Sequence, residues 1–288
     1  MSQLLTLAVP SSARARSLVT SRGTFAAFDM APGDSVSYRG TVVMVPGFMG
    51  SKEDFLPMLP PLSRAGYRVV TIDGRGQHET GGSHPPGAYA REALARDLVA
   101  VVEAVDDGPV HLVGHSYGAL LARVAVLQTE GDPVLWRSLT LMNFGPAEVS
   151  TQQRERLSLL LSVIDSMTLE GIWPFLDVQD DAIADDVRSF MRARWLANDP
   201  THIKAAAEQL LTEPDRTAEL TAIQLPKAVI SGSPDLTWAP EGVTKMADAL
   251  SAQLITMPGG GHSPNVHRPE ESAAELANFW DAITTTHH

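Results

Sequence analysis

The 288-residue chain contains no cysteine, which excludes disulfide bonds, thiolate metal sites and a cysteine nucleophile. The lack of cysteine is also typical of a reducing compartment, so we expect a cytoplasmic protein. Basic residues are few: 22 Lys and Arg against 34 Asp and Glu give a net charge of −12, without any Lys/Arg-rich run. Nucleic acids and anionic membrane surfaces are therefore poor candidate partners. No apolar run approaches the length of a membrane span, so we expect no membrane association.

The first residues lack the pattern of a secretory signal peptide. Such a peptide carries its positive charge before the apolar stretch, whereas Arg14, Arg16 and Arg22 come after apolar residues 4–9. We expect this segment to form an arm on the surface.

The remaining composition, 44% hydrophobic and 19% charged, is that of a globular protein with one large core and room for an insertion. A turn signal at 31–34 predicts an antiparallel hairpin of residues 24–30 and 35–39. Unbroken apolar runs then alternate with helical patterns, which is typical of a parallel sheet covered on both faces. The fold class predicted is α/β, with a mostly parallel eight-stranded sheet and helices on both faces. The apolar runs are 41–45, 67–72, 110–113, 137–142, 228–231 and 253–257.

Residues 146–222 carry no strand signal and favour helices at 151–166, 182–196 and 202–211. We interpret this segment as a helical cap inserted between two parts of the core, residues 1–145 and 223–288. Insertions above the carboxyl edge of a sheet commonly line binding sites. The alternative is a packed helical excursion that has no functional role.

The segment Val110–Leu121 predicts a strand, a sharp turn and a helix, with Ser116 at the apex of the turn. Glycines flank this serine in the pattern Gly-His-Ser-Tyr-Gly. Such a turn needs residues without a Cβ so that strand and helix can pass close to each other. Ser116 is therefore the candidate nucleophile.

A serine nucleophile needs a base to accept its proton and an acid to orient that base. His262 follows the last predicted strand and a flexible glycine loop, so it can reach over Ser116. Asp235 follows another strand and is the candidate acid. The competing position, after the strand that succeeds the turn, holds Asn143, which cannot carry the charge that stabilises an imidazolium.

The other histidines are weaker candidates for the base. We expect His115 to pack within the turn and His111 to be structural. The remaining ones lie in polar surroundings and are expected to be solvated or locally hydrogen-bonded; they are His78, His84, His202 and His267.

Backbone N–H donors must also stabilise the oxyanion of an acyl-transfer intermediate. Tyr117, directly after the nucleophile, can offer one, and Phe48 in the loop Pro46-Gly47-Phe48-Met49-Gly50 can offer the second.

These motifs, and the order Ser116, Asp235, His262, resemble the α/β-hydrolase superfamily from about residue 24 onward. Two motifs depart from the family pattern, because Pro46 replaces the usual histidine before Gly47 and the segment Asp73–Thr80 is altered at its end. The resemblance implies the fold and serine chemistry. It does not imply a substrate, because the superfamily covers many reactions.

Our leading hypothesis is a serine hydrolase that cleaves a small, mainly apolar carboxylic ester or related acyl compound without a metal or cofactor. The alternatives are a triad enzyme that does not hydrolyse, such as a lyase or an acyl-shifting enzyme, and a ligand receptor with negligible turnover. The sequence leaves the oligomeric state open. In the cap, Trp173 and Phe175 are candidate pocket residues, because Pro174 between them predicts a loop.

Overall fold

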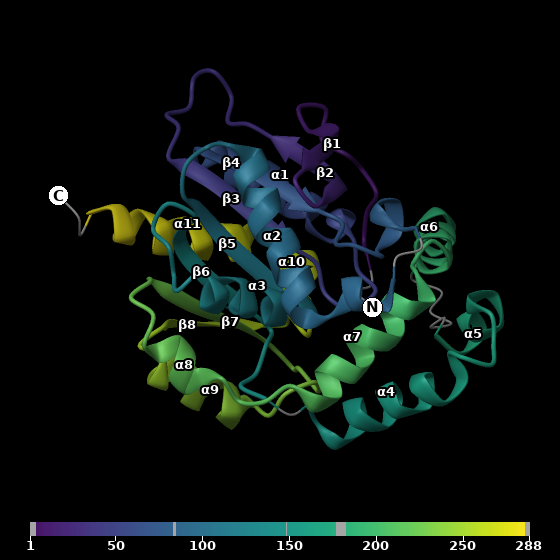
Figure 1. The fold of residues 1–288 in the computed structure, drawn as a ribbon. Helices are drawn as coiled ribbons and strands as arrows, with labels where there is room; N and C mark the ends of the chain where they lie inside the picture. Colours follow the sequence, from purple (N-terminus) through teal and green to yellow (C-terminus); the bar gives the residue numbers. More distant parts are fainter. Residues whose placement is uncertain (1–3, 83–84, 148, 177–182, 286–288) are drawn as a thin grey trace.

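A computed structural model describes residues 4–82, 85–147, 149–176 and 183–285. Within these residues the centre is an eight-stranded sheet in the order β1-β2-β4-β3-β5-β6-β7-β8 (Figure 1). Strands β3 to β8 run parallel, whereas β1 pairs antiparallel with β2 and β2 antiparallel with β4. The mostly parallel sheet predicted from the sequence is therefore confirmed. The strands are β1 (Arg14–Thr20), β2 (Gly23–Met30), β3 (Gly40–Val45), β4 (Tyr67–Ile72), β5 (Val110–His115), β6 (Trp136–Met142), β7 (Lys227–Ser233) and β8 (Gln253–Pro258).

Helices cover both faces of the sheet, as the unbroken apolar strands predict. Every residue of β3 and β5 is buried. Val43 and Val45 belong to one apolar cluster and Val42 and Met44 to another, because successive side chains of a strand point to opposite faces. One face is covered by η1 (Lys52–Met58), α1 (Leu59–Arg64) and α11 (Pro269–Thr285), and the other by α2 (Arg91–Val105), α3 (Tyr117–Gln128) and α9 (Pro240–Ala249).

The described residues between β6 and β7 form five helices joined by loops, and no strand lies among them. Figure 1 shows α4 to α7 as a group beside the sheet, which we call the helical insertion. The last helix of this stretch, α8, lies instead with α9 and also contacts α3. The five helices are α4 (Thr151–Val163), α5 (Leu169–Leu176), α6 (Asp185–Leu196), α7 (Pro200–Thr212) and α8 (Thr217–Thr221).

Two buried ion pairs tie the helical insertion to the rest of the protein. Arg123 of α3 donates to Glu213, directly after α7, with an Nη2–Oε1 distance of 2.6 Å. Arg194 of α6 donates to Asp54 of η1 with an Nη1–Oδ1 distance of 2.6 Å, and neither side chain has exposed surface. A buried charge without its partner destabilises the fold, so each of these pairs is favourable only while both of its residues are present.

The hairpin expected in the first part of the chain is wrong in one of its two strands. The hairpin partner of β2 is β1, and residues 35–39 form no strand. Residues 5–13, in the expected surface arm, form no helix or strand and none of them is buried. The strand β1 that follows is an edge strand whose mostly exposed residues hide the strand pattern. Only Leu18 of β1 is buried, so its sequence lacks the alternation by which half-buried strands are recognised.

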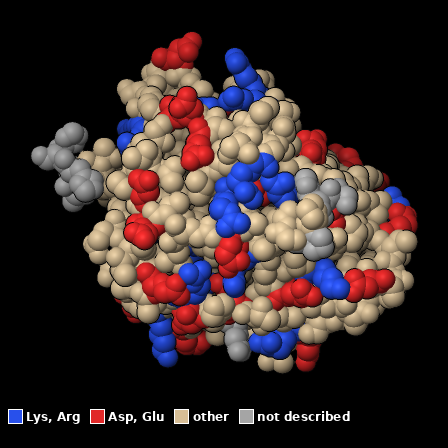
Figure 2. All heavy atoms as spheres, in the orientation of Figure 1, with Lys and Arg blue, Asp and Glu red and all other residues tan. Residues whose placement is uncertain are grey.

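The face of the molecule in Figure 2 carries acidic and basic side chains interspersed over a larger neutral surface. No helix among the described residues is long and apolar enough to cross a membrane.

Candidate active site

Ser116 lies between β5 and α3 in a strained conformation, with φ of +54° and ψ of −118°. The neighbouring glycines make this turn possible. A Cβ on Gly114 would lie 2.4 Å from the Cα of Ala119, and one on Gly118 would lie 2.4 Å from the carbonyl oxygen of Val45. Both approaches are to backbone atoms that cannot move aside, so the flanking glycines are required by sterics.

His262, in the loop after β8, faces the serine. Its Nε2 lies 3.0 Å from the Oγ of Ser116, which is hydrogen-bond distance. The indole of Trp238 stacks on the imidazole with 6.0 Å between ring centroids and 26° between planes. This stacking restricts the ring to the orientation that reaches Ser116.

The other side of the His262 ring faces Asp235, which follows β7. The Nδ1 of His262 lies 3.0 and 3.1 Å from the two carboxylate oxygens. A proton on Nδ1 is donated to the carboxylate, which leaves the lone pair of Nε2 to accept from the Ser116 hydroxyl.

Two further donors hold the carboxylate of Asp235. Its Oδ2 accepts from Nδ2 of Asn143 at 2.9 Å, and its Oδ1 accepts from the backbone N–H of Thr237 at 2.8 Å. Burial alone would raise the pKa of Asp235, but the hydrogen bonds from His262, Asn143 and Thr237 outweigh it and lower the pKa. The group is therefore a carboxylate at neutral pH.

His115 lies beneath the site and contacts the backbone of His262, as expected of a packing residue. Its Nε2 donates to the carbonyl oxygen of His262 at 2.7 Å. Burial lowers the pKa of His115 to about 3, so the ring is neutral and does not compete with His262 for a proton.

The loop after β3 lies against the serine. A Cβ on Gly47 would lie only 3.2 Å from the Cβ of Ser116. The Nε2 of Gln77 donates to the carbonyl oxygen of Gly47 at 3.0 Å and fixes the loop. Phe48 follows Gly47 directly. Tyr117 is the first residue of α3, where backbone N–H groups have no acceptor within the helix.

Three side chains that support the site, two polar and one aromatic, are not predicted by the sequence. Asn143, considered only as a rival acid, instead holds Asp235 and also donates to the carbonyl oxygen of Gly261 at 2.9 Å. Gln77 and Trp238 were not singled out. The position of Asn143 at the carboxyl end of β6, beside that of β7, was the available signal.

His202 is a correction, because it was expected in polar surroundings and is buried in α7. Its ring packs between those of Tyr89 and Tyr117, with centroid distances of 5.6 and 6.2 Å. Burial lowers its pKa to about 4. Helical spacing with Ile203 and Ala206, which are also buried, would have indicated this. His84 lies outside the described residues.

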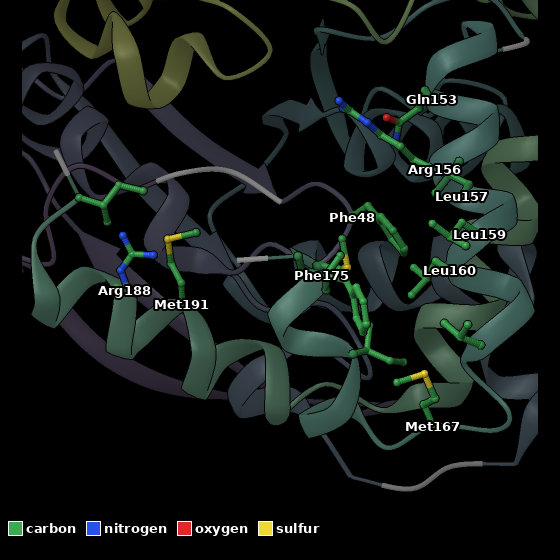
Figure 3. Close-up of a pocket in the computed structure, with 15 residues that line it drawn as sticks. Phe48, Gln153, Arg156, Leu157, Leu159, Leu160, Met167, Phe175, Arg188 and Met191 are labelled. Atoms are coloured by element: carbon green, nitrogen blue, oxygen red, sulfur yellow. The ribbon is translucent and has the colours of Figure 1, made fainter. Parts of the chain in front are cut away.

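An elongated, mainly apolar cavity of about 630 Å³ lies between the helical insertion and the loop after β3 (Figure 3). Phe48 and Met49 contribute from that loop. Phe175 lines the cavity and is 78% exposed, whereas Trp173 is buried in the apolar core and is not among the lining residues. Pro174 lies inside α5, so the loop expected between these aromatics is wrong and the helix sends them to different sides.

No group of three or more His, Asp or Glu among the described residues is placed to hold a metal ion. At Ser116 the hydrogen bonds described above bring together its hydroxyl, the His262 imidazole and the Asp235 carboxylate.

The sequence profile of the Alpha/beta hydrolase family matches residues 42–275. The chain belongs to this family. "Putative carbamate hydrolase RutD" of Variovorax paradoxus (strain S110) is 29% identical over 249 residues, which are 83% of this chain and 90% of the relative. The sn-1-specific diacylglycerol lipase ABHD11 of Mus musculus is 23% identical over 85% of this chain and 80% of the relative.

Solved structures of other proteins share the fold of this alpha/beta hydrolase. The crystal structure of E-2-(acetamidomethylene)succinate hydrolase has a TM-score of 0.71 at 19% identity and covers 93% of this chain and 99% of its own. A carboxylesterase structure from Nitrososphaera gargenis has a TM-score of 0.73 at 21% identity, over 94% of this chain and 100% of its own. At these identities the likeness concerns the fold alone.

Proposed function

We propose that this alpha/beta hydrolase is a serine hydrolase that cleaves carboxylic esters or related acyl compounds through an acyl-enzyme. The observation that carries the proposal is the continuous hydrogen-bonded chain from Asp235 through His262 to Ser116, with links of 3.0 Å on each side of the imidazole. This arrangement activates a hydroxyl that is unreactive by itself.

In the proposed reaction, the Oγ of Ser116 attacks the substrate carbonyl carbon while Nε2 of His262 takes the hydroxyl proton. The imidazolium so formed is stabilised by the carboxylate of Asp235, which stays ionised. His262 then gives its proton to the leaving alcohol. A water molecule, deprotonated by the same Nε2, attacks the acyl-enzyme. Nε2 then returns this proton to the Oγ of Ser116 as the acid leaves, which restores the free serine.

The tetrahedral intermediate carries a negative charge on the former carbonyl oxygen. We assign its stabilisation to the backbone N–H groups of Tyr117 and Phe48. The contact of Gly47 with Ser116 and the anchoring of that glycine by Gln77 support the assignment of Phe48. Losing one such donor costs about 10²–10³ in kcat in the standard case.

We further propose that the helical insertion acts as a cap over the site and supplies an acyl-binding cavity. Phe48 supports this proposal, because it lines the cavity and belongs to the loop that lies against Ser116. The cap would end near Glu213 and not at residue 222, because α8 packs on core helices. A mainly apolar cavity favours substrates with an apolar acyl group.

The test is pre-steady-state hydrolysis of p-nitrophenyl esters by the wild-type protein and by Ser116→Ala. We expect a burst that matches the enzyme concentration, followed by steady turnover, and neither in Ser116→Ala. A burst with negligible turnover would identify a receptor that retains the fold, and an undiminished burst in the variant would show that Ser116 is not the nucleophile.

A further inference from the structure

The charged residues described in the cavity lining are basic, whereas the protein as a whole is acidic. The chain carries 34 acidic and 22 basic residues. Among the described residues that line the cavity, however, the only charged ones are Arg156 and Arg188, and the only other polar one is Gln153. The rest of the lining is apolar. A ligand that fits this lining is apolar along most of its length and negatively charged where it meets an arginine.

The two arginines lie at different ends of the cavity. Figure 3 shows Arg156 with Gln153 on α4 at one end, and Arg188 with Met191 on α6 at the other. Gln153 and Arg156 are three residues apart on one helix, so their side chains share a face. That end of the cavity therefore combines a guanidinium with an amide that can donate a further hydrogen bond.

The charge of Arg156 is not neutralised within the described part of the chain. No described Asp or Glu forms an ion pair with it, and the residue is exposed and lines the cavity. Arg192 on α6 provides the contrast, because it is also exposed, forms an ion pair with Glu170 and does not line the cavity. An exposed cation at one end of an apolar cavity, with no described carboxylate against it, has its donors available to an anionic ligand.

The cavity also has a defined direction. Leu157 and Leu160 follow Arg156 along α4 and line the cavity, and Phe48 and Met49 belong to the loop that lies against Ser116. A chain bound with its charged end at Arg156 would run past these apolar residues towards the loop beside the nucleophile.

We propose that the substrate is an acyl compound with a carboxylate at the end of its apolar acyl chain, and that Arg156 binds this carboxylate with help from Gln153. The inference rests on the proposed function and adds the substrate class. It implies that half-esters of dicarboxylic acids are better substrates than neutral esters of equal length.

The experiment compares two series of p-nitrophenyl esters with chains of six to twelve carbons. In one series the far end of the acyl chain is a free carboxylate, and in the other it is the methyl ester of that carboxylate. At the chain length that is hydrolysed best, we expect kcat/KM to be about tenfold higher for the carboxylate than for its methyl ester. This factor corresponds to the low end of the free-energy range for a hydrogen bond to a charged group. The preference should shrink as salt is added, because Arg156 is exposed.

Three variants locate the binding group. Arg156→Gln should reduce the preference ratio to about one, Arg156→Lys should retain part of it, and the control Arg192→Gln should leave it unchanged. A wild-type enzyme that hydrolyses both series equally well would refute the inference while leaving the proposed function intact. Loss of the preference in Arg188→Gln but not in Arg156→Gln would overturn the assignment to Arg156. Failure of Ser116 to form an acyl-enzyme with either series would refute the proposed function itself.

Discussion

The ion pair between Arg194 and Asp54 should be the most sensitive link between the helical insertion and the core. Both side chains are fully buried, and the carboxylate accepts from no described side chain other than Arg194. Its Oδ2 has no described hydrogen-bond partner. Arg194→Met keeps much of the apolar volume but leaves the carboxylate unpaired. We expect the free energy of unfolding to fall by about 3–5 kcal/mol, the usual cost of breaking a buried pair.

The sign of the pH dependence follows from the pKa of Asp54. Burial raises this pKa, and Arg194 opposes the increase, yet the pKa remains raised. Without Arg194 the pKa should rise further, so the folded variant binds a proton that the unfolded chain releases above about pH 3.9. Stability then falls as pH rises towards the folded pKa. The loss in free energy of unfolding of Arg194→Met relative to the wild type should therefore be larger at pH 8 than at pH 5.

Urea denaturation at the two pH values measures both effects, and the double variant Asp54→Leu/Arg194→Met is the matched control. Because it buries no unpaired charge, it should lie within about 1 kcal/mol of wild type. A loss below 1 kcal/mol in Arg194→Met, or a deficit equal at both pH values, would refute the reasoning.

Other substitutions test the site. Asn143→Leu should lower kcat far more than it changes KM and cost about 3 kcal/mol of stability, because Asp235 and Gly261 lose a buried donor; unchanged kcat would count against its role. Asp235→Asn should lower kcat by about 10⁴. The pKa of Asp235 is lowered in the folded protein, so its carboxylate stabilises the fold above about pH 4 and loses this effect in more acid solution. The free energy of unfolding of Asp235→Asn should therefore fall less than that of the wild type when the pH is lowered below 4. Phe175→Ala should shift the acyl-length preference with little change in Tm, whereas Trp173→Ala should cost about 3–5 kcal/mol and leave the preference unchanged; the reverse result would restore Trp173 as a pocket residue.

The sequence predicts the parallel part of the fold well because β3 to β7 are buried along most of their length and read as apolar runs. It also predicts which side chains meet at the carboxyl edge of the sheet, since Ser116 follows a strand directly and Asp235 and His262 lie in the loops after two other strands. That inference needs only the topology of parallel strands.

Features that depend on side-chain direction were harder to predict. The exposed edge strand β1 has no apolar alternation, and Pro174 continues α5 where a loop was expected. The contribution of Asn143 depends on the close approach of β6 and β7, which the sequence expresses only through strand order. That Arg156 and Arg188 line one cavity follows only from the positions of α4 and α6 in the structure.

The proposed reaction requires that Ser116 is a nucleophile activated by His262. Labelling with a fluorophosphonate, followed by peptide mass spectrometry, tests it most directly. We expect one phosphonyl group per chain on Ser116 in the wild-type protein, much slower labelling in His262→Ala and none in Ser116→Ala. Stoichiometric labelling of another residue, or equally fast labelling of Ser116 after loss of the imidazole, would contradict the account.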